Sequence, residues 1–154
     1  MLISFIHTML LLGGVVLAGQ IQAQQITEKI KNEQEEVLKE DPRNFAANYV
    51  VGAYYFNQAI PPHLQTTTMT LTQYLDEGNP LEEEKKKSLR KALPYFENAY
   101  ALNKNETRIK DILLKIYQHL GMLPFARNNT ESEKQLINEA LAEKLKAIQF
   151  QEIN

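Results

Sequence analysis

Few side chains in this chain could do acid–base or metal chemistry, and their spacing does not bring them together. His63 and His119 have no second ligand at a metal-binding spacing, and His7 lies in an apolar N-terminal stretch. The adjacent carboxylates Glu82 and Glu83 belong to a run of charge with no apolar pocket to raise a pKa. His-Glu-x-x-His, a phosphate-binding Gly-rich loop and a Gly-x-Ser-x-Gly turn are all missing from the sequence. The sequence therefore predicts a protein that is not an enzyme and has no metal or cofactor.

Composition indicates one ordinary globular domain. Of the 154 residues, 44% are hydrophobic and 23% are charged, so the chain has enough apolar material to bury a core. The formal net charge of −2 argues against a nucleic-acid-binding protein, since such proteins carry a basic excess. The chain has no cysteine, which excludes disulfides, thiolate zinc sites and lipid attachment to an N-terminal cysteine.

Residues 1–23 are typical of a secretory signal peptide, although the usual positive start is missing. They are mostly apolar, no charged side chain occurs before Glu28, and small residues lead up to Ala23. We therefore expect cleavage after Ala23, export of residues 24–154, and no stable membrane span in the mature protein. Two alternatives stay open, namely an uncleaved membrane anchor over residues 2–19 and a buried helix.

The mature part, residues 24–154, is predicted to be an all-α domain. Apolar residues recur every three or four positions, as they do on one face of a helix. The expected helices cover residues 28–40, 45–59, 81–102, 108–120 and 131–149. Pro94 lies inside the third of these helices. We favour a kink there over a split, because the apolar face continues in register on both sides.

Residues 60–80 do not follow this pattern and predict an irregular insert. The double proline at 61–62 is expected to end the preceding helix, and the Thr-rich run 65–72 is a poor helix former. A turn follows, after which Asn79 would cap a new helix with Pro80 in its first position. We interpret the insert as a flexible loop rather than a lid over a ligand.

A pattern of small, aromatic and turn residues spans this insert. Its positions are Pro42, Gly52, Tyr55, Ala92, Phe96 and Ala99. The first three are spaced by ten and three residues, and the last three by four and three. The pattern resembles the tetratricopeptide repeat, a helix–turn–helix unit of about 34 residues. The step from Tyr55 to Ala92 is 37 residues instead of the expected nine, an excess of 28 that falls around the insert.

A second unit is partly present further along the chain. Tyr117 lies 18 residues after the last position of the first pattern, and Gly121 resembles the family's helix-ending glycine. Lys104 replaces the expected turn proline, and Thr130 replaces an expected aromatic residue. The resemblance covers roughly residues 41–126. It implies a short array of antiparallel helix pairs with an insert between the helices of the first pair, and a plain helical bundle is the alternative.

The resemblance implies a protein-binding function. In such arrays the first helix of each pair lines a concave groove that holds a peptide or a partner helix. By position, the candidate contacts here are Asn48, Tyr54, Asn57, Lys110 and His119. The chain also resembles small exported repeat proteins of Gram-negative bacteria, which implies a scaffold in the periplasm or cell envelope with a protein partner of unknown identity. The alternative is a helical envelope protein that holds a small ligand between the aromatic helices and the insert.

Overall fold

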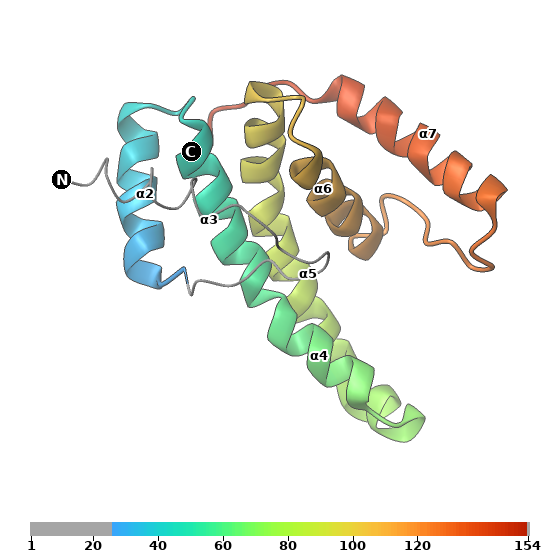
Figure 1. Cartoon of the computed structure of the whole chain (residues 1–154). Coiled ribbons are helices and arrows are strands. Elements are labelled where there is room, and N and C mark those ends of the chain that lie inside the picture. Colours follow the sequence, from blue (N-terminus) through green and yellow to red (C-terminus); the bar gives the residue numbers. More distant parts are fainter. Residues whose placement is uncertain (1–25, 154) are drawn as a thin grey trace, which may run out of the picture.

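The structure is a computed structural model that describes residues 26–153, and within this range it contains six helices and no strand. The predicted all-α fold class is confirmed. The helices are α2 (Glu28–Glu40), α3 (Phe45–Gln58), α4 (Ile60–Thr68), α5 (Leu71–Leu102), α6 (Thr107–His119) and α7 (Glu131–Ala147). In Figure 1, α2, α3, the second half of α5 and α6 stand side by side as antiparallel neighbours. The predicted signal peptide lies outside the described residues and stays a prediction.

Five of the six helices start at a side chain that accepts a hydrogen bond from the first turn. The capping residues are Thr27, Asn44, Thr70, Glu106 and Thr130. Thr70 and Thr130 belong to full capping boxes, in which Gln73 and Glu133 bond back to the cap. Since the first backbone N–H groups of a helix have no partner within it, these side chains determine where each helix begins.

Two helix–turn–helix units of the chain have the same geometry. One consists of α2 and α3, and the other of the end of α5 and α6. In the first unit the Tyr55 hydroxyl donates to Glu35 at 3.3 Å, and in the second the Tyr117 hydroxyl donates to Glu97 at 2.7 Å. In each bond the tyrosine follows the glutamate by 20 positions. Both residues of the second bond lie 62 positions after their equivalents in the first bond. Equivalent bonds therefore tie the two helices of each unit together.

The two units also share the turn between their helices. α2 is capped by Asp41 (φ −132°, ψ 84°) and α5 by Asn103 (φ −142°, ψ 86°), so the capping residues have nearly the same backbone. In both turns the side-chain oxygen of this residue accepts from the N–H two positions later, at 3.2 Å. The backbone thus repeats after 62 residues, which is about 28 more than one tetratricopeptide unit.

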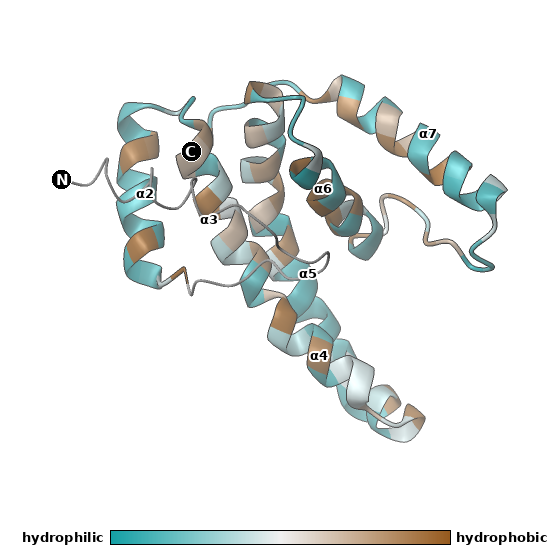
Figure 2. Ribbon diagram, viewed as in Figure 1, coloured by the Kyte–Doolittle hydropathy of each residue, from teal (hydrophilic) through white to brown (hydrophobic). Residues whose placement is uncertain are grey.

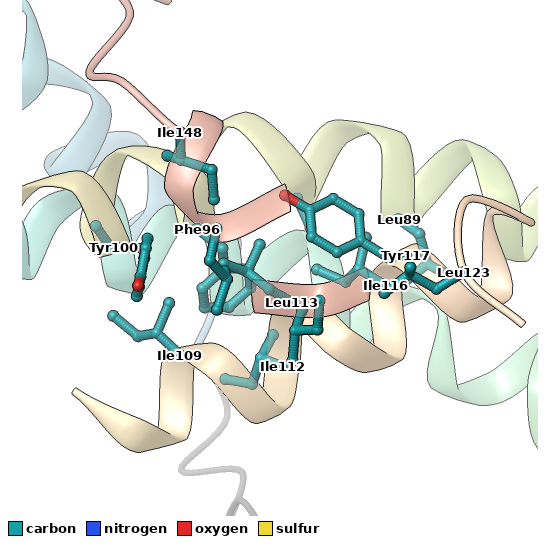
Figure 3. Packing of buried hydrophobic residues seen from close by; sticks show 14 of the residues in the cluster. Leu89, Phe96, Tyr100, Ile109, Ile112, Leu113, Ile116, Tyr117, Leu123 and Ile148 are labelled. Carbon is teal, nitrogen blue, oxygen red and sulfur yellow. The ribbon is translucent and has the colours of Figure 1, made fainter. Parts of the chain in front are cut away.

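The core extends from the contact of α3 with α5 to α6 and α7, and Phe96 of α5 is one of its fully buried residues. The Phe96 ring meets Tyr49 and Phe56 edge-on, with ring centroids 5.8 and 6.3 Å apart. Gly52 allows the close approach, since a Cβ there would lie 3.2 Å from the Phe96 ring and from Cβ of Tyr95. Figure 3 shows buried side chains of α5 and α6 converging on this region. Gly52 and Phe96, which belong to the two separated parts of the pattern, are therefore in close contact.

The expectation of an irregular insert at residues 60–80 is wrong, because almost all of this stretch is helical. Pro61 and Pro62 open α4 instead of ending the helical path. They lie in its first turn, where a missing N–H costs no intrahelical bond. Only Met69 and Thr70 separate α4 from α5. The two helices pack along each other, and this contact outweighs the poor helix propensity of the Thr-rich run.

α5 runs unbroken for 32 residues although it contains Pro80 and Pro94. The expected helix start at Pro80 is therefore wrong, and the possible split at Pro94 does not occur. A proline inside a helix removes one backbone hydrogen bond, and packing against α3, α4 and α6 offsets that loss. Gly78 is not a turn residue either. It is buried beside the ring of Tyr74, where a Cβ would lie only 2.7 Å from the ring.

α4 and the first half of α5 form a helical hairpin that extends away from the other helices (Figure 1). We term residues 60–84 the projecting hairpin. The extra residues are divided between an outgoing and a returning arm, so the chain comes back to the core and continues the pattern at Ala92. At the base of the returning arm the Lys85 ammonium is buried and lies 2.6 Å from the Glu82 carboxylate.

A non-helical segment after α7, residues 148–153, returns across the bundle, and we term it the strap (Figure 1). Asn98 of α5 is buried and holds the strap's main chain at Gln151. Its amide donates to the Gln151 carbonyl at 2.7 Å and accepts from the Gln151 N–H at 2.8 Å. Arg43 lies over the Phe150 ring, 5.2 Å from its centroid. The last helix therefore ends two residues earlier than expected, because the chain turns away to make these contacts.

Candidate functional site

Exposed apolar side chains gather towards the end of the projecting hairpin. Leu71 is 75% exposed, Leu75 69% and Leu64 57%, and the first two are the most exposed large apolar side chains in residues 26–153. Leu64 and Leu75 lie equally far from the turn at residues 69–70, on opposite arms. Figure 2 shows apolar positions on both arms of the hairpin. We term Leu64, Leu71 and Leu75 the leucine tip.

Local hydrogen bonds define the end of the hairpin. The Thr70 hydroxyl accepts from the N–H of Gln73 at 3.3 Å, and the Gln73 side chain accepts from the N–H of Thr70 at 2.9 Å. The hydroxyls of Thr67 and Thr68 donate to backbone carbonyls one turn earlier, at 2.9 and 3.0 Å. The Thr-rich run, from which a loop was predicted, therefore supplies hydrogen-bond partners to backbone groups in the last turn of α4 and the first turn of α5.

Tyr74 and Gly78 lie on the same face of α5 within the projecting hairpin. The ring of Tyr74 packs against the buried Gly78, one helical turn further on. Leu71 and Leu75 each precede one of these residues by three positions, which turns their side chains about 60° around the helix from Tyr74 and Gly78. Both leucines consequently stay in solvent while the helix itself is held by its neighbour.

The base of the projecting hairpin brings together two histidines that lie far apart in the sequence. The rings of His63 and His119 are 5.3 Å apart, and Phe125 packs against His119 at the same centroid distance. Nδ1 of His63 is buried without a hydrogen-bond partner. Burial lowers the pKa of His119, and the nearby Lys85 and His63 lower it further, while Glu82 acts in the opposite direction. The folded protein therefore favours a neutral His119.

We expect acid to destabilise the protein through His119. Because its folded-state pKa is lowered, the unfolded chain binds the proton more readily, and stability rises with pH. The contribution is complete above the ordinary histidine pKa of about 6.5 and is lost as the pH falls from there to the lower folded-state value. The melting temperature should drop over this range, and H119F, which keeps a ring, should show a smaller drop. An identical pH dependence in H119F would contradict this assignment.

Asn48 does not lie where the groove hypothesis needs it. It is 1% exposed, and its amide donates to the carbonyls of Pro42 and Asn44 at 3.0 and 2.9 Å. The side chain therefore holds the turn between α2 and α3 and is not accessible to a partner. The expectation of a binding role for Asn48 is corrected, because its side chain is buried and bonds to backbone carbonyls of its own turn.

Three other candidates stay partly accessible without forming a cluster. Tyr54, Asn57 and Lys110 are all half-buried. The ring of Tyr54 meets Tyr55 edge-on at 5.4 Å, and the ammonium of Lys31 lies 5.6 Å from the Tyr54 centroid. Among residues 26–153, no hydrogen bond, ion pair or ring contact joins the three candidates to one another. The structure thus gives them no shared geometry beyond their places on α3 and α6.

Two shallow hollows of the described surface lie on the outer helices. One is lined by α7 residues that include Glu131 and Asn138, and the other by α2 residues that include Glu28 and Asn32. Neither lies between the aromatic helices and residues 60–80, where the small-ligand alternative would place its pocket. Among residues 26–153, no group of three or more His, Cys, Asp or Glu side chains is arranged as a metal site.

Comparison with known proteins gives no further assignment. No family model, curated protein or solved structure matches the chain. In the part that the structure describes, no helix has the length and apolar content needed to cross a bilayer. The arguments on function therefore rest on the residues and their arrangement.

Proposed function

We propose that this chain is an exported, tetratricopeptide-like module that docks a protein partner in the cell envelope. The two equivalent helix–turn–helix units support the repeat character, since their turns and their tyrosine–carboxylate bonds correspond. Residues 1–23 support export by their composition alone. The leucine tip is the observation that carries the docking function.

The leucine tip favours a partner for an energetic reason. Burying one leucine side chain fully gains about 1.5–3 kcal/mol, so three exposed leucines leave a large gain unused in the isolated chain. Exposed apolar groups at a projecting end are typical of protein interaction sites. We therefore place the main contact at the leucine tip. The resemblance to a repeat array adds Tyr54 and Asn57 of α3 and Lys110 of α6 as candidates for a second contact.

Site-specific photo-crosslinking tests this proposal in the cells that make the protein. A photoreactive amino acid in place of Leu75 should give one discrete crosslinked product, because this position would face the partner. The matched control is Leu136 of α7, which is 64% exposed but lies away from the projecting hairpin. Adding L71S should remove the product obtained from position 75. The same products from positions 75 and 136, or no product from position 75, would refute docking at the tip.

A further inference from the structure

A buried amide of α5 holds the main chain of the strap at both of its polar groups. Asn98 is 2% exposed, and its side-chain nitrogen donates to the Gln151 carbonyl while its side-chain oxygen accepts from the Gln151 N–H. Two directly opposite residues of antiparallel strands exchange the same pair of bonds. The Asn98 amide therefore takes the place of one residue of an adjacent strand, and it recognises an extended main chain rather than a particular side chain.

The side chains of the strap alternate between the bundle and solvent, as they do in a strand. Ile148 is buried in the core cluster (Figure 3), and Phe150 is half-buried. Gln149 and Gln151, which alternate with them, are exposed. Arg43, in the turn between α2 and α3, lies over the Phe150 ring. The strap is thus held as extended peptides are held in their binding sites, by main-chain bonds and by alternate side chains on one side.

Few interactions keep the strap in place. Among residues 26–153, its hydrogen bonds to the rest of the chain are the two to Asn98 and a longer one, from the Ile148 N–H to the Leu145 carbonyl at 3.4 Å. Departure of the strap would leave both polar groups of the Asn98 amide without a partner, which is costly at a buried site. Another extended chain in the same place would satisfy them again.

We infer that the surface under the strap is a second docking site, separate from the leucine tip, and that it takes an extended peptide segment of a partner protein in exchange for the strap. The segment carries an aliphatic residue at the place of Ile148 and an aromatic residue two positions later, over Arg43. The next residue is not proline, because Asn98 needs its N–H. The strap itself shows which peptide chemistry the site accepts.

The strap of a second copy is a poorer occupant than a partner's segment. It offers the same residues, so exchange between two copies would form no contact that each chain does not already make. The chain's own strap also follows α7 directly, and a short tether gives an effective concentration of the order of millimolar. A partner's segment displaces the strap only by making better contacts at the same places, so the strap sets a threshold that weak ligands do not pass.

Binding of a labelled peptide to the full chain tests this inference. The probe is a fluorescent peptide with the sequence of residues 147–153, and its twin has proline at position 151. In the full chain, Q151P removes the N–H that bonds to Asn98 and should release the strap. The probe should therefore bind Q151P about tenfold more tightly than the unchanged protein, in which the tethered strap competes. The matched control Q151A keeps the N–H and should behave as the unchanged protein does.

Two further measurements separate the Asn98 amide from general packing. Adding N98A to Q151P should abolish probe binding, while circular dichroism should show the same helix content in both variants. Hydrogen exchange of the unchanged protein needs no variant. The Gln151 N–H should exchange more slowly than that of Glu152, because only the first has a partner, and faster than that of the buried Leu113, because the strap opens without unfolding of the helices.

Several results would overturn the inference. A Q151P chain that does not bind the probe, or a Gln151 N–H that exchanges as slowly as that of Leu113, would show that the strap is a fixed part of the fold. Equal binding of the proline twin would show that the main chain is not recognised. Self-association in sedimentation that Q151P abolishes would assign the site to the strap of a second copy. L71S, which removes the crosslinked product at the leucine tip, should leave probe binding unchanged, so the two docking sites can fail separately.

Discussion

Replacing Phe96 with alanine is expected to destabilise the protein by about 3–5 kcal/mol, the usual cost of removing a fully buried phenylalanine. The ring is completely shielded and fills the space between α3 and α5, where Tyr49 and Phe56 meet it edge-on. Small domains have a free energy of unfolding of only about 5–15 kcal/mol, so this loss is a large part of the total. Urea denaturation followed by circular dichroism would measure it as a lower midpoint.

Phe125 supplies the control for this experiment. It is 53% exposed in the connection between α6 and α7, so its truncation to alanine should cost far less. F96A and F125A should therefore separate clearly in their denaturation midpoints. Similar midpoints would mean that the packing of α3 on α5 contributes little, and the account of the core given above would be wrong.

Replacing Gly52 with leucine is expected to force α3 and α5 apart. A Cβ at this position already lies 3.2 Å from the Phe96 ring and from Cβ of Tyr95, and leucine adds three further carbons. Overpacking of this kind costs about 1–3 kcal/mol and sometimes more, and because side chains of α5 already crowd this position we expect the upper end. Thermal unfolding should show a large fall in melting temperature, with loss of tyrosine near-ultraviolet circular dichroism.

Two companion variants make the Gly52 result interpretable. G52A adds only the tight Cβ, and the better helix propensity of alanine, worth about 1 kcal/mol, should leave stability nearly unchanged. A46L adds the same bulk on an exposed position of the same helix and should be tolerated. Equal stability of G52L and A46L would contradict a close contact at this glycine.

The pairing of α3 with α5 could be predicted because its signal is local in each helix. Gly52 and Phe96 reveal by size alone which faces can approach closely, and the structure places them against each other. The intervening distance in sequence did not obscure this, because each helix carries its own small–aromatic spacing. Helix faces elsewhere followed from the apolar period in the same way.

The helical nature of residues 60–80 could not be predicted, because two capping signals compete there. Asn79 with Glu82 and Thr70 with Gln73 both match the pattern of a helix start. The structure uses the earlier one, since Tyr74 packs on Gly78 and α4 supplies a partner along the added turns. Tertiary packing decides which of the two possible helix starts is used, and the local sequence contains no signal of that packing.

The candidate site was missed for the same reason. Leu71 and Leu75 have the one-turn spacing of a helix face, but a stretch interpreted as a loop has no faces to compare. The role of Asn98 in holding the strap could not be predicted either, because its hydrogen bonds join residues 53 positions apart in the sequence. Asn48 shows the reverse error, in which a position inferred from family resemblance holds a turn together instead of binding.

The length of the projecting hairpin can change without changing the packing of the helices that form the core. Its outgoing arm, α4, has 9 residues and its returning arm, residues 71–84, has 14, which correspond to about two and a half and about four helical turns. Adding or removing about seven residues in each arm would move the leucines outward or inward by about 10 Å. Seven residues are close to two full turns, so the direction of the leucine side chains around the helix axis would stay nearly the same. Such a spacer could be lengthened or shortened to meet targets at different depths, with the bundle beneath it left as it is.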